Sequence, residues 1–155
     1  MAKGLFSPQN PEKYLGDITK IRFLSSWEMN FMVFCDTNPN VVKWGSEEFT
    51  IKYFHPIKQK VVNYYPDFIV KYKDQEGKLI TEVIEVKPAK ESPVVGSNGQ
   101  LIIRPNMSTY DKVQMVINHA KWTAAIALCA TLGIKFRVLT EQEIVRKKHA
   151  TKVKT

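Results

Sequence analysis

The sequence predicts one α/β domain in which helices flank a mixed, mainly antiparallel sheet. Short runs rich in β-branched and aromatic residues fill the middle of the chain, and a tight turn joins two of them. A long helical pattern follows, and then one more strand-like run. This order of elements is typical of an α/β domain with a mixed sheet.

Length and composition limit the number of domains. A chain of 155 residues with 44% apolar residues can bury one sizeable core but hardly two. The prolines and glycines near the N-terminus follow no steady period, which indicates an extended arm. We therefore divide the chain into an extended N-terminal arm at 1–20, one folded domain at 21–148 and a basic tail at 149–155.

Charge and cysteine content narrow the functional class. The chain has 23 Lys and Arg against 15 Asp and Glu, a net charge of +8 that suits nucleic acid, although ribosomal and membrane-surface proteins share it. Cys35 and Cys129 lie far apart without a metal-binding motif, so we expect reduced core thiols. No signal peptide or membrane-spanning stretch is visible, which predicts a soluble cytoplasmic protein without a membrane partner.

The first half of the chain predicts a helix followed by strands. Ser25 is a helix cap, and the apolar residues after it have the spacing of a helical face. Strands are expected at 41–44 and 49–54, and longer ones at 61–72 and 79–87. The sequence DQEG between the last two predicts a turn and therefore an antiparallel hairpin.

The second half predicts a long loop, a long helix and a last strand. Residues 88–107 are rich in proline and glycine, which indicates an excursion with one small hairpin. The elements expected after it are a helix at 109–132 between the cap Ser108 and the stop Gly133, a strand at 134–139, and a short helix opened by a capping box of Thr140 and Glu143.

Two carboxylates and a lysine converge on one spot of the predicted hairpin. Glu85 and Lys87 are two residues apart in a strand, so their side chains share a face. If the turn centres on Gln75 and Glu76, Asp67 falls nearly opposite Glu85, with Cβ atoms roughly 4.5–5.5 Å apart. Close carboxylates repel each other and each has a raised pKa unless a cation neutralises them, so the cluster invites Mg²⁺.

This residue set suits phosphodiester hydrolysis. The reaction needs a polarised phosphoryl oxygen, an activated water and relief of negative charge, which a metal and a lysine can supply together. Lys87 would orient or help deprotonate the water, and Glu28 in the first helix would add a third carboxylate. The alternative is an ordinary surface pair of Glu85 and Lys87, but an acid between Pro66 and an apolar run is poorly suited to mere strand building.

The same residues resemble a known signature. PD at 66–67 and EVK at 85–87 resemble the motif of the PD-(D/E)XK nuclease superfamily. The SSWE sequence containing Glu28, and FRVLTE at 136–141, resemble the subgroup that includes transposon end-cleaving endonucleases. The resemblance implies a restriction-endonuclease-like core that uses Mg²⁺, with Mn²⁺ as a substitute, and no organic cofactor. It also implies a catalytic set in which Asp67 and Glu85 bind metal, Glu28 supports them and Lys87 is the catalytic lysine.

Most of the chain is similar to the head completion nucleases of large contractile-tailed phages, through KGLFSPQNPEKY, SSWEMNFMVFCD, YYPDFIVKY, IEVKP, HAKW and FRVLTE. This implies a metal-dependent DNA endonuclease that processes packaged DNA ends during phage head completion, before neck and tail attachment. Double-stranded DNA and phage portal or neck proteins would be its partners, and the host cytoplasm or the virion head and neck its location. The alternatives are a structural head or neck protein that binds DNA without cutting, and a transposase-type or junction-resolving endonuclease.

Three further residues are candidates for DNA binding. Gln114 and Lys121 lie seven residues apart, two turns along one helix face, although a solvated polar stripe explains them as well. Arg22 is the third, but relatives often carry arginine directly before SSWE, where this chain has Leu24. No role is assigned to His55, His119 or His149, core packing is expected for Trp27, Trp44 and Trp122, and Arg146 with the tail lysines is a second basic feature.

Overall fold

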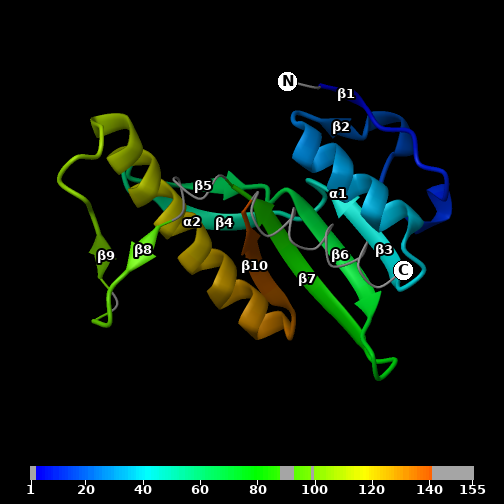
Figure 1. Ribbon diagram of the computed structural model, residues 1–155. Helices are drawn as coiled ribbons and strands as arrows, with labels where there is room; N and C mark the ends of the chain where they lie inside the picture. The colour runs from blue at the N-terminus through cyan, green and yellow to red at the C-terminus, as the bar shows by residue number, and fades with distance from the viewer. Residues whose placement is uncertain (1–2, 88–92, 99, 141–155) are drawn as a thin grey trace.

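A four-stranded mixed sheet forms the centre of the molecule. The computed structural model describes residues 3–87, 93–98 and 100–140. The sheet has the order β10-β7-β6-β3, in which β10 runs parallel to β7 and the other pairs are antiparallel (Figure 1). Its strands are β3 (Val41–Ser46), β6 (Phe68–Lys73), β7 (Leu79–Val86) and β10 (Lys135–Leu139). The predicted mixed, mainly antiparallel sheet is confirmed.

The β6–β7 hairpin sets the register on which the candidate site depends. The Asp74 carboxylate accepts hydrogen bonds from the backbone N–H groups of Glu76 and Lys78, each at 2.9 Å, and Gly77 has φ +79°. An Asp side chain that accepts backbone N–H bonds and a Gly with positive φ are typical of a tight turn. Phe68 is paired with Ile84, so the position before β6 lies beside Glu85.

Helix α1 (Ser26–Thr37) covers one face of the sheet. The Ser25 hydroxyl accepts a hydrogen bond from the Glu28 N–H at 3.2 Å, which confirms the predicted cap. Because side chains alternate between the faces of a strand, one residue in two of each strand points to this side. The core here joins helix residues to strand residues, among them Phe31, Met32, Cys35, Trp44, Phe68, Val70, Ile84 and Leu139.

Helix α2 (Thr109–Leu132) and a separate two-stranded hairpin form the second core. The helix begins at the cap Ser108 and ends at Gly133, with φ +69°, as the sequence predicts. The hairpin consists of β4 (Ile51–His55) and β5 (Lys60–Tyr64), paired antiparallel. This core contains Ile51, Tyr53, Tyr64 and Ala125, with Trp122, Leu128 and Phe136 packed against it.

The single strand predicted at 61–72 is wrong, because the chain breaks it in two. Strand β5 ends at Tyr64 and β6 begins at Phe68. Pro66 lies between them, fully buried, and proline has no N–H to donate to a sheet. The sequence pattern missed this break because apolar residues continue on both sides of it. As a result, β4 and β5 leave the central sheet and pack on α2 instead.

The remaining elements are short. The small hairpin expected within 88–107 is present as β8 (Val94–Val95) and β9 (Leu101–Ile102). The final helix opened by Thr140 and Glu143, the tail at 149–155, Arg146 and His149 lie largely or wholly outside the described residues. No described helix combines the length and apolar character that crossing a membrane requires.

The N-terminal segment packs on the domain rather than extending from it. It contains β1 (Gly4–Leu5), which pairs with β2 (Arg22–Phe23), and two 3₁₀ helices, Pro11–Lys13 and Ile18–Lys20. Tyr14 is buried with its ring edge against Trp44, at a centroid distance of 4.7 Å. The segment therefore contributes to the first core.

One buried carboxylate anchors this segment to α1. Asp36 is 2% exposed and accepts hydrogen bonds from the N–H groups of Gln9, at 2.7 Å, and Asn10, at 2.9 Å. Lys13 donates to the Asp36 carbonyl at 3.0 Å. Sequence patterns gave no sign of this anchor, because its donors lie 26 and 27 residues away.

Several smaller expectations are also resolved by the fold. Cys35 and Cys129 are free and buried, and Trp44 is fully buried. The Nδ1 atom of His55 accepts hydrogen bonds from the N–H groups of Ile57 and Lys58, at 3.2 and 3.1 Å. His55 therefore closes the β4–β5 turn.

We predict that Asp36→Ala lowers the free energy of unfolding by roughly 3 kcal/mol, because two backbone N–H groups lose the buried carboxylate that accepts from them. The melting temperature should fall by about 6–12 °C in a thermal unfolding experiment. Asp17→Ala is the matched control, since Asp17 also accepts from a backbone N–H but its side chain is 51% exposed. Equal losses in the two variants would contradict the anchoring role.

Candidate active site

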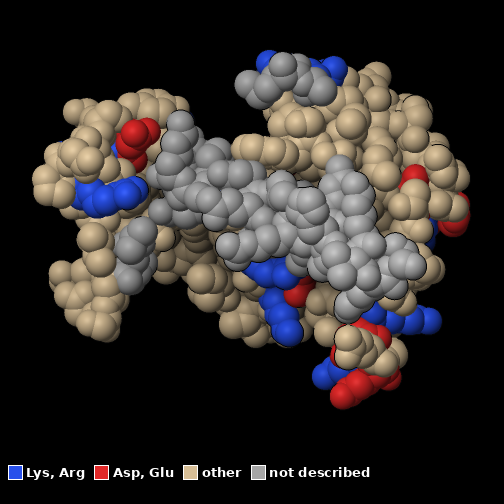
Figure 2. All heavy atoms as spheres, in the orientation of Figure 1, with Lys and Arg blue, Asp and Glu red and all other residues tan. Residues whose placement is uncertain are grey.

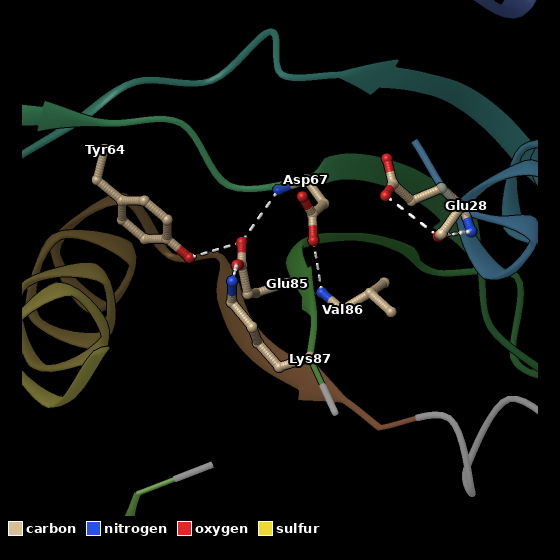
Figure 3. Close-up of polar contacts among 7 residues, drawn as sticks. Glu28, Tyr64, Asp67, Glu85, Val86 and Lys87 are labelled. Carbon is tan, nitrogen blue, oxygen red and sulfur yellow. Dashed lines mark hydrogen bonds and ion pairs between the residues drawn. The ribbon is translucent and has the colours of Figure 1, made fainter. Parts of the chain in front are cut away.

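Asp67 and Glu85 meet where the β6–β7 ladder ends. The Asp67 N–H donates to Glu85 Oε1 at 3.3 Å, and the Val86 N–H donates to Asp67 Oδ2 at 2.7 Å (Figure 3). Side-chain oxygens thus take the place that backbone carbonyls would hold one residue further along the ladder. The convergence of these two carboxylates, predicted from the hairpin, is present in the structure.

Glu85 is held from two further directions. Its side chain is buried, the Tyr64 hydroxyl donates to Oε1 at 2.9 Å, and Lys87 Nζ lies 3.5 Å from Oε2. Tyr64 ends β5, so the break at Pro66 brings an aromatic hydroxyl from the separate hairpin to the carboxylate. Lys87 follows β7 directly, and its side chain is 29% exposed, so it reaches both the carboxylate and solvent.

The two carboxyl groups are costly to ionise. Burial raises the pKa of Asp67 well above its ordinary value, and the charges of Glu85 and Glu28 raise it further. The Val86 N–H and Lys87 act in the opposite direction. Burial also raises the pKa of Glu85, against the lowering effect of Lys87 and the Tyr64 hydroxyl. A divalent cation beside the pair would relieve this repulsion.

Lys121 of α2 also belongs to this site. Its Nζ lies 5.3 Å from the centre of the Tyr64 ring, a cation–π contact. Burial and the like charge of Lys87 lower the pKa of Lys121, while Glu85 and Asp67 raise it. Two carboxylates therefore face two ammonium groups. Of the three residues predicted to bind DNA, Lys121 is the one brought to the carboxylates.

Glu28 lies near the pair without joining it. Its carboxylate accepts a hydrogen bond from the Ser25 hydroxyl at 3.2 Å, and its charge raises the pKa of Asp67. Within the described ranges, no group of three or more His, Cys, Asp or Glu side chains is close enough to hold a metal ion. Asp67 and Glu85 still fit Mg²⁺, which usually keeps several waters and needs only one or two carboxylates.

Arg22 and Gln114, the other two residues predicted to bind DNA, do not contact Asp67 or Glu85 within the described part of the chain. Arg22 is exposed in β2 and lines a shallow pocket of about 330 Å³ formed with Lys3, Leu5 and Leu24. Gln114 is half-buried, two helical turns before Lys121. Their roles in DNA binding stay predictions.

Tyr64 is the site residue that sequence reasoning missed. It stands in the run YYPD, where it looks like one more strand residue. Only its position three residues before Asp67 hinted at a role. The partner of its hydroxyl, 21 residues away, depends on how β5 lies against the end of β7.

Comparison with known proteins identifies the class. The sequence profile of the family described as TnsA-like endonuclease N terminal matches residues 38–141, a span that includes both carboxylates and both lysines of the site. The chain belongs to this endonuclease family, which has a restriction-endonuclease-like fold.

A curated relative extends the match beyond that span. The chain is 36% identical over 139 residues to the head completion nuclease of Enterobacteria phage T4, which covers 89% of this chain and 90% of that protein. No solved structure matches the chain. The resemblances to transposon end-cleaving endonucleases and to the head completion nucleases of contractile-tailed phages are confirmed.

We predict that Asp67→Asn stabilises the metal-free protein. The raised pKa means that the native state loses stability as the pH rises from about 4, where the unfolded carboxyl ionises, through the native pKa. Asparagine does not ionise, and its Oδ1 can still accept from the Val86 N–H. At pH 7 the gain should be roughly 0.5–2 kcal/mol, as when other strained functional sites are relieved.

The measurement is urea unfolding in EDTA between pH 4 and pH 8, with Asp74→Asn in the turn as the control. The gain from Asp67→Asn should be near zero at the acidic end and grow with pH. A gain independent of pH, or an equal gain in the control, would contradict the assigned repulsion.

Proposed function

We propose that this protein is a metal-dependent DNA endonuclease that acts at Asp67 and Glu85. The observation that carries the proposal is the pairing of buried Glu85 with half-buried Asp67, with Lys87 beside them, in a chain that belongs to an endonuclease family. Mg²⁺ is the proposed ion, with Mn²⁺ as a substitute. DNA as the substrate is supported by the net charge of +8 and by the two lysines at the site.

Each residue then has a distinct task. When bound, the metal polarises the scissile phosphate and lowers the pKa of a water. Asp67 and Glu85 hold it, and Glu28 supports them from α1. Lys87, which is partly exposed to solvent, offsets negative charge that builds up on the phosphate. Tyr64 is a positioning residue, because its hydroxyl fixes the orientation of Glu85.

We further infer that the cut is made during phage head completion, on the DNA end left after packaging and before the neck and tail attach. The support is the relative from phage T4, which is a head completion nuclease by name and aligns along nearly its whole length. Portal or neck proteins are proposed partners, and the infected host cytoplasm and the virion head or neck the proposed locations.

The first experiment is cleavage of linear and supercoiled DNA by the purified protein. Cutting should require Mg²⁺ or Mn²⁺, stop in EDTA and disappear in Asp67→Ala. Lys78→Ala is the control, since Lys78 is exposed in the β6–β7 turn, at the other end of the hairpin from the site. Folded wild-type protein that binds DNA but does not cut it with any divalent metal would support the non-cutting structural role instead.

Lys87→Ala should lower the rate of cleavage roughly 10²–10⁴-fold, the usual range for loss of a positioned catalytic group. Tyr64→Phe should lower it less, because the ring and its contact with Lys121 remain and only the hydroxyl is lost. Single-turnover rates with enzyme in excess separate these effects from binding. Equal rates for Tyr64→Phe and wild type would remove the positioning role.

The family match also favours a second candidate, cutting at a defined DNA structure as a transposase-type or junction-resolving endonuclease does. Cleavage rates on nicked, forked and four-way-junction DNA, compared with the rate on linear duplex, decide between the two candidate functions. Cleavage at least tenfold faster on one branched substrate supports the second candidate.

The biological role is tested by supplying this protein to T4 phage that lacks its own head completion nuclease. Infectious particles should return with the wild-type protein and not with Asp67→Asn. Rescue by Asp67→Asn would show that cutting is dispensable and support the structural alternative. Lack of rescue by the wild type would count against the head completion role.

A further inference from the structure

The β4–β5 hairpin has one buried and one open face. Ile51, Tyr53 and Tyr64 point into the core against α2. The opposite face exposes a row of paired residues, Lys52 with Asn63 and Phe54 with Val61, and Phe54 and Val61 are 54% and 62% exposed. Exposed apolar side chains side by side on a ribbon indicate a surface that is covered when the protein works.

The tip of the hairpin continues this surface. His55 closes the turn by accepting two backbone N–H bonds, which leaves the next residues projecting into solvent. Ile57 is 58% exposed, and Lys58 and Lys60 on either side of the turn are exposed too. Residues 49–66 contain three lysines and no aspartate or glutamate.

The positive charges of the tip continue toward the carboxylate pair. Burial lowers the pKa of His55, and the like charges of Lys58, Lys121 and Lys60 lower it further. Lys121 in turn contacts Tyr64, whose hydroxyl binds Glu85. Lys58 and Lys60 of the tip and Lys121 of α2 thus form a series of positive charges that leads from the hairpin to the carboxylates.

We propose that the β4–β5 hairpin is a DNA-binding arm that grips the backbone of the duplex beside the cut and feeds it to Asp67 and Glu85. This deepens the proposed function and rests on it. Lys58 and Lys60 neutralise phosphates, Lys52 extends the contact along the ribbon, and Ile57 and Phe54 cover sugars or base edges. A two-stranded ribbon is also narrow enough to enter a DNA groove.

Charge and spacing favour DNA over a protein or a lipid surface. The exposed apolar pair Phe54 and Val61 is small, Lys52 lies beside it on the same face, and Lys58 and Lys60 lie at the tip. The β6–β7 turn at the far end of the sheet offers a contrast, since Lys73 and Lys78 there stand among Asp74 and Glu76 (Figure 2). Such a mixed cluster has no net charge to attract phosphate, whereas the lysines of the arm are not offset by any acidic residue within 49–66.

The test is binding of Lys58→Gln/Lys60→Gln to a duplex oligonucleotide in EDTA, at several salt concentrations. Loss of two phosphate contacts should flatten the slope of log K against log salt by about 1.8. The affinity lost between 50 and 200 mM salt then becomes about tenfold smaller than for wild type. The control Lys73→Gln/Lys78→Gln removes the same charge from the mixed cluster and should keep the wild-type slope.

Three results would overturn the arm. If both double variants flatten the slope equally, the effect is one of net charge alone. If Lys58→Gln/Lys60→Gln keeps the wild-type slope, Lys58 and Lys60 do not contact phosphates. Wild-type binding to phosphatidylserine vesicles but not to DNA, lost in Lys58→Gln/Lys60→Gln, would assign the surface to a membrane. Because binding is measured without metal, the outcome does not depend on cutting, so failure of the arm and failure of the nuclease are separate results.

Discussion

The two hydrogen bonds that join Asp67 to the Glu85 carboxylate and to the Val86 N–H organise the functional part of this molecule. Asp67 N–H donates to Glu85 and Asp67 Oδ2 accepts from Val86, so the two carboxylates sit where a strand pair would otherwise continue. Ionising the pair is costly, because burial raises the pKa of both carboxyl groups and the charges of Glu85 and Glu28 raise that of Asp67 further. The β6–β7 hairpin and its tight turn hold the pair in place against that cost.

Pro66 explains why a second element reaches the same place. Since it cannot donate to a sheet, the chain leaves the β4–β5 hairpin and re-enters the central sheet one residue after Asp67. Because of that break, the Tyr64 hydroxyl contacts Glu85, and the β4–β5 hairpin packs against α2. One proline therefore connects the carboxylates, the positioning hydroxyl and the exposed lysine-bearing ribbon.

Charge is balanced locally although the chain as a whole is basic. Asp67 and Glu85 face Lys87 and Lys121, so the site itself is close to neutral before any metal or phosphate arrives. The proposed divalent cation would create the excess of positive charge that a phosphodiester needs. The surrounding lysines of the β4–β5 hairpin lie outside this balance and remain free to attract the backbone of DNA.

The sequence by itself determined the class of fold, the caps at Ser25 and Ser108, the β6–β7 turn and the meeting of Asp67 with Glu85 and Lys87. Each of these follows from local spacing, because a turn of known length sets the register and alternation sets the face. Tertiary structure alone decided the approach of Tyr64 to Glu85, the place of Lys121 beside Tyr64, and the anchoring of Gln9 and Asn10 by Asp36. Those contacts join residues far apart in the chain, where the packing of whole elements, and no local pattern, selects the partner.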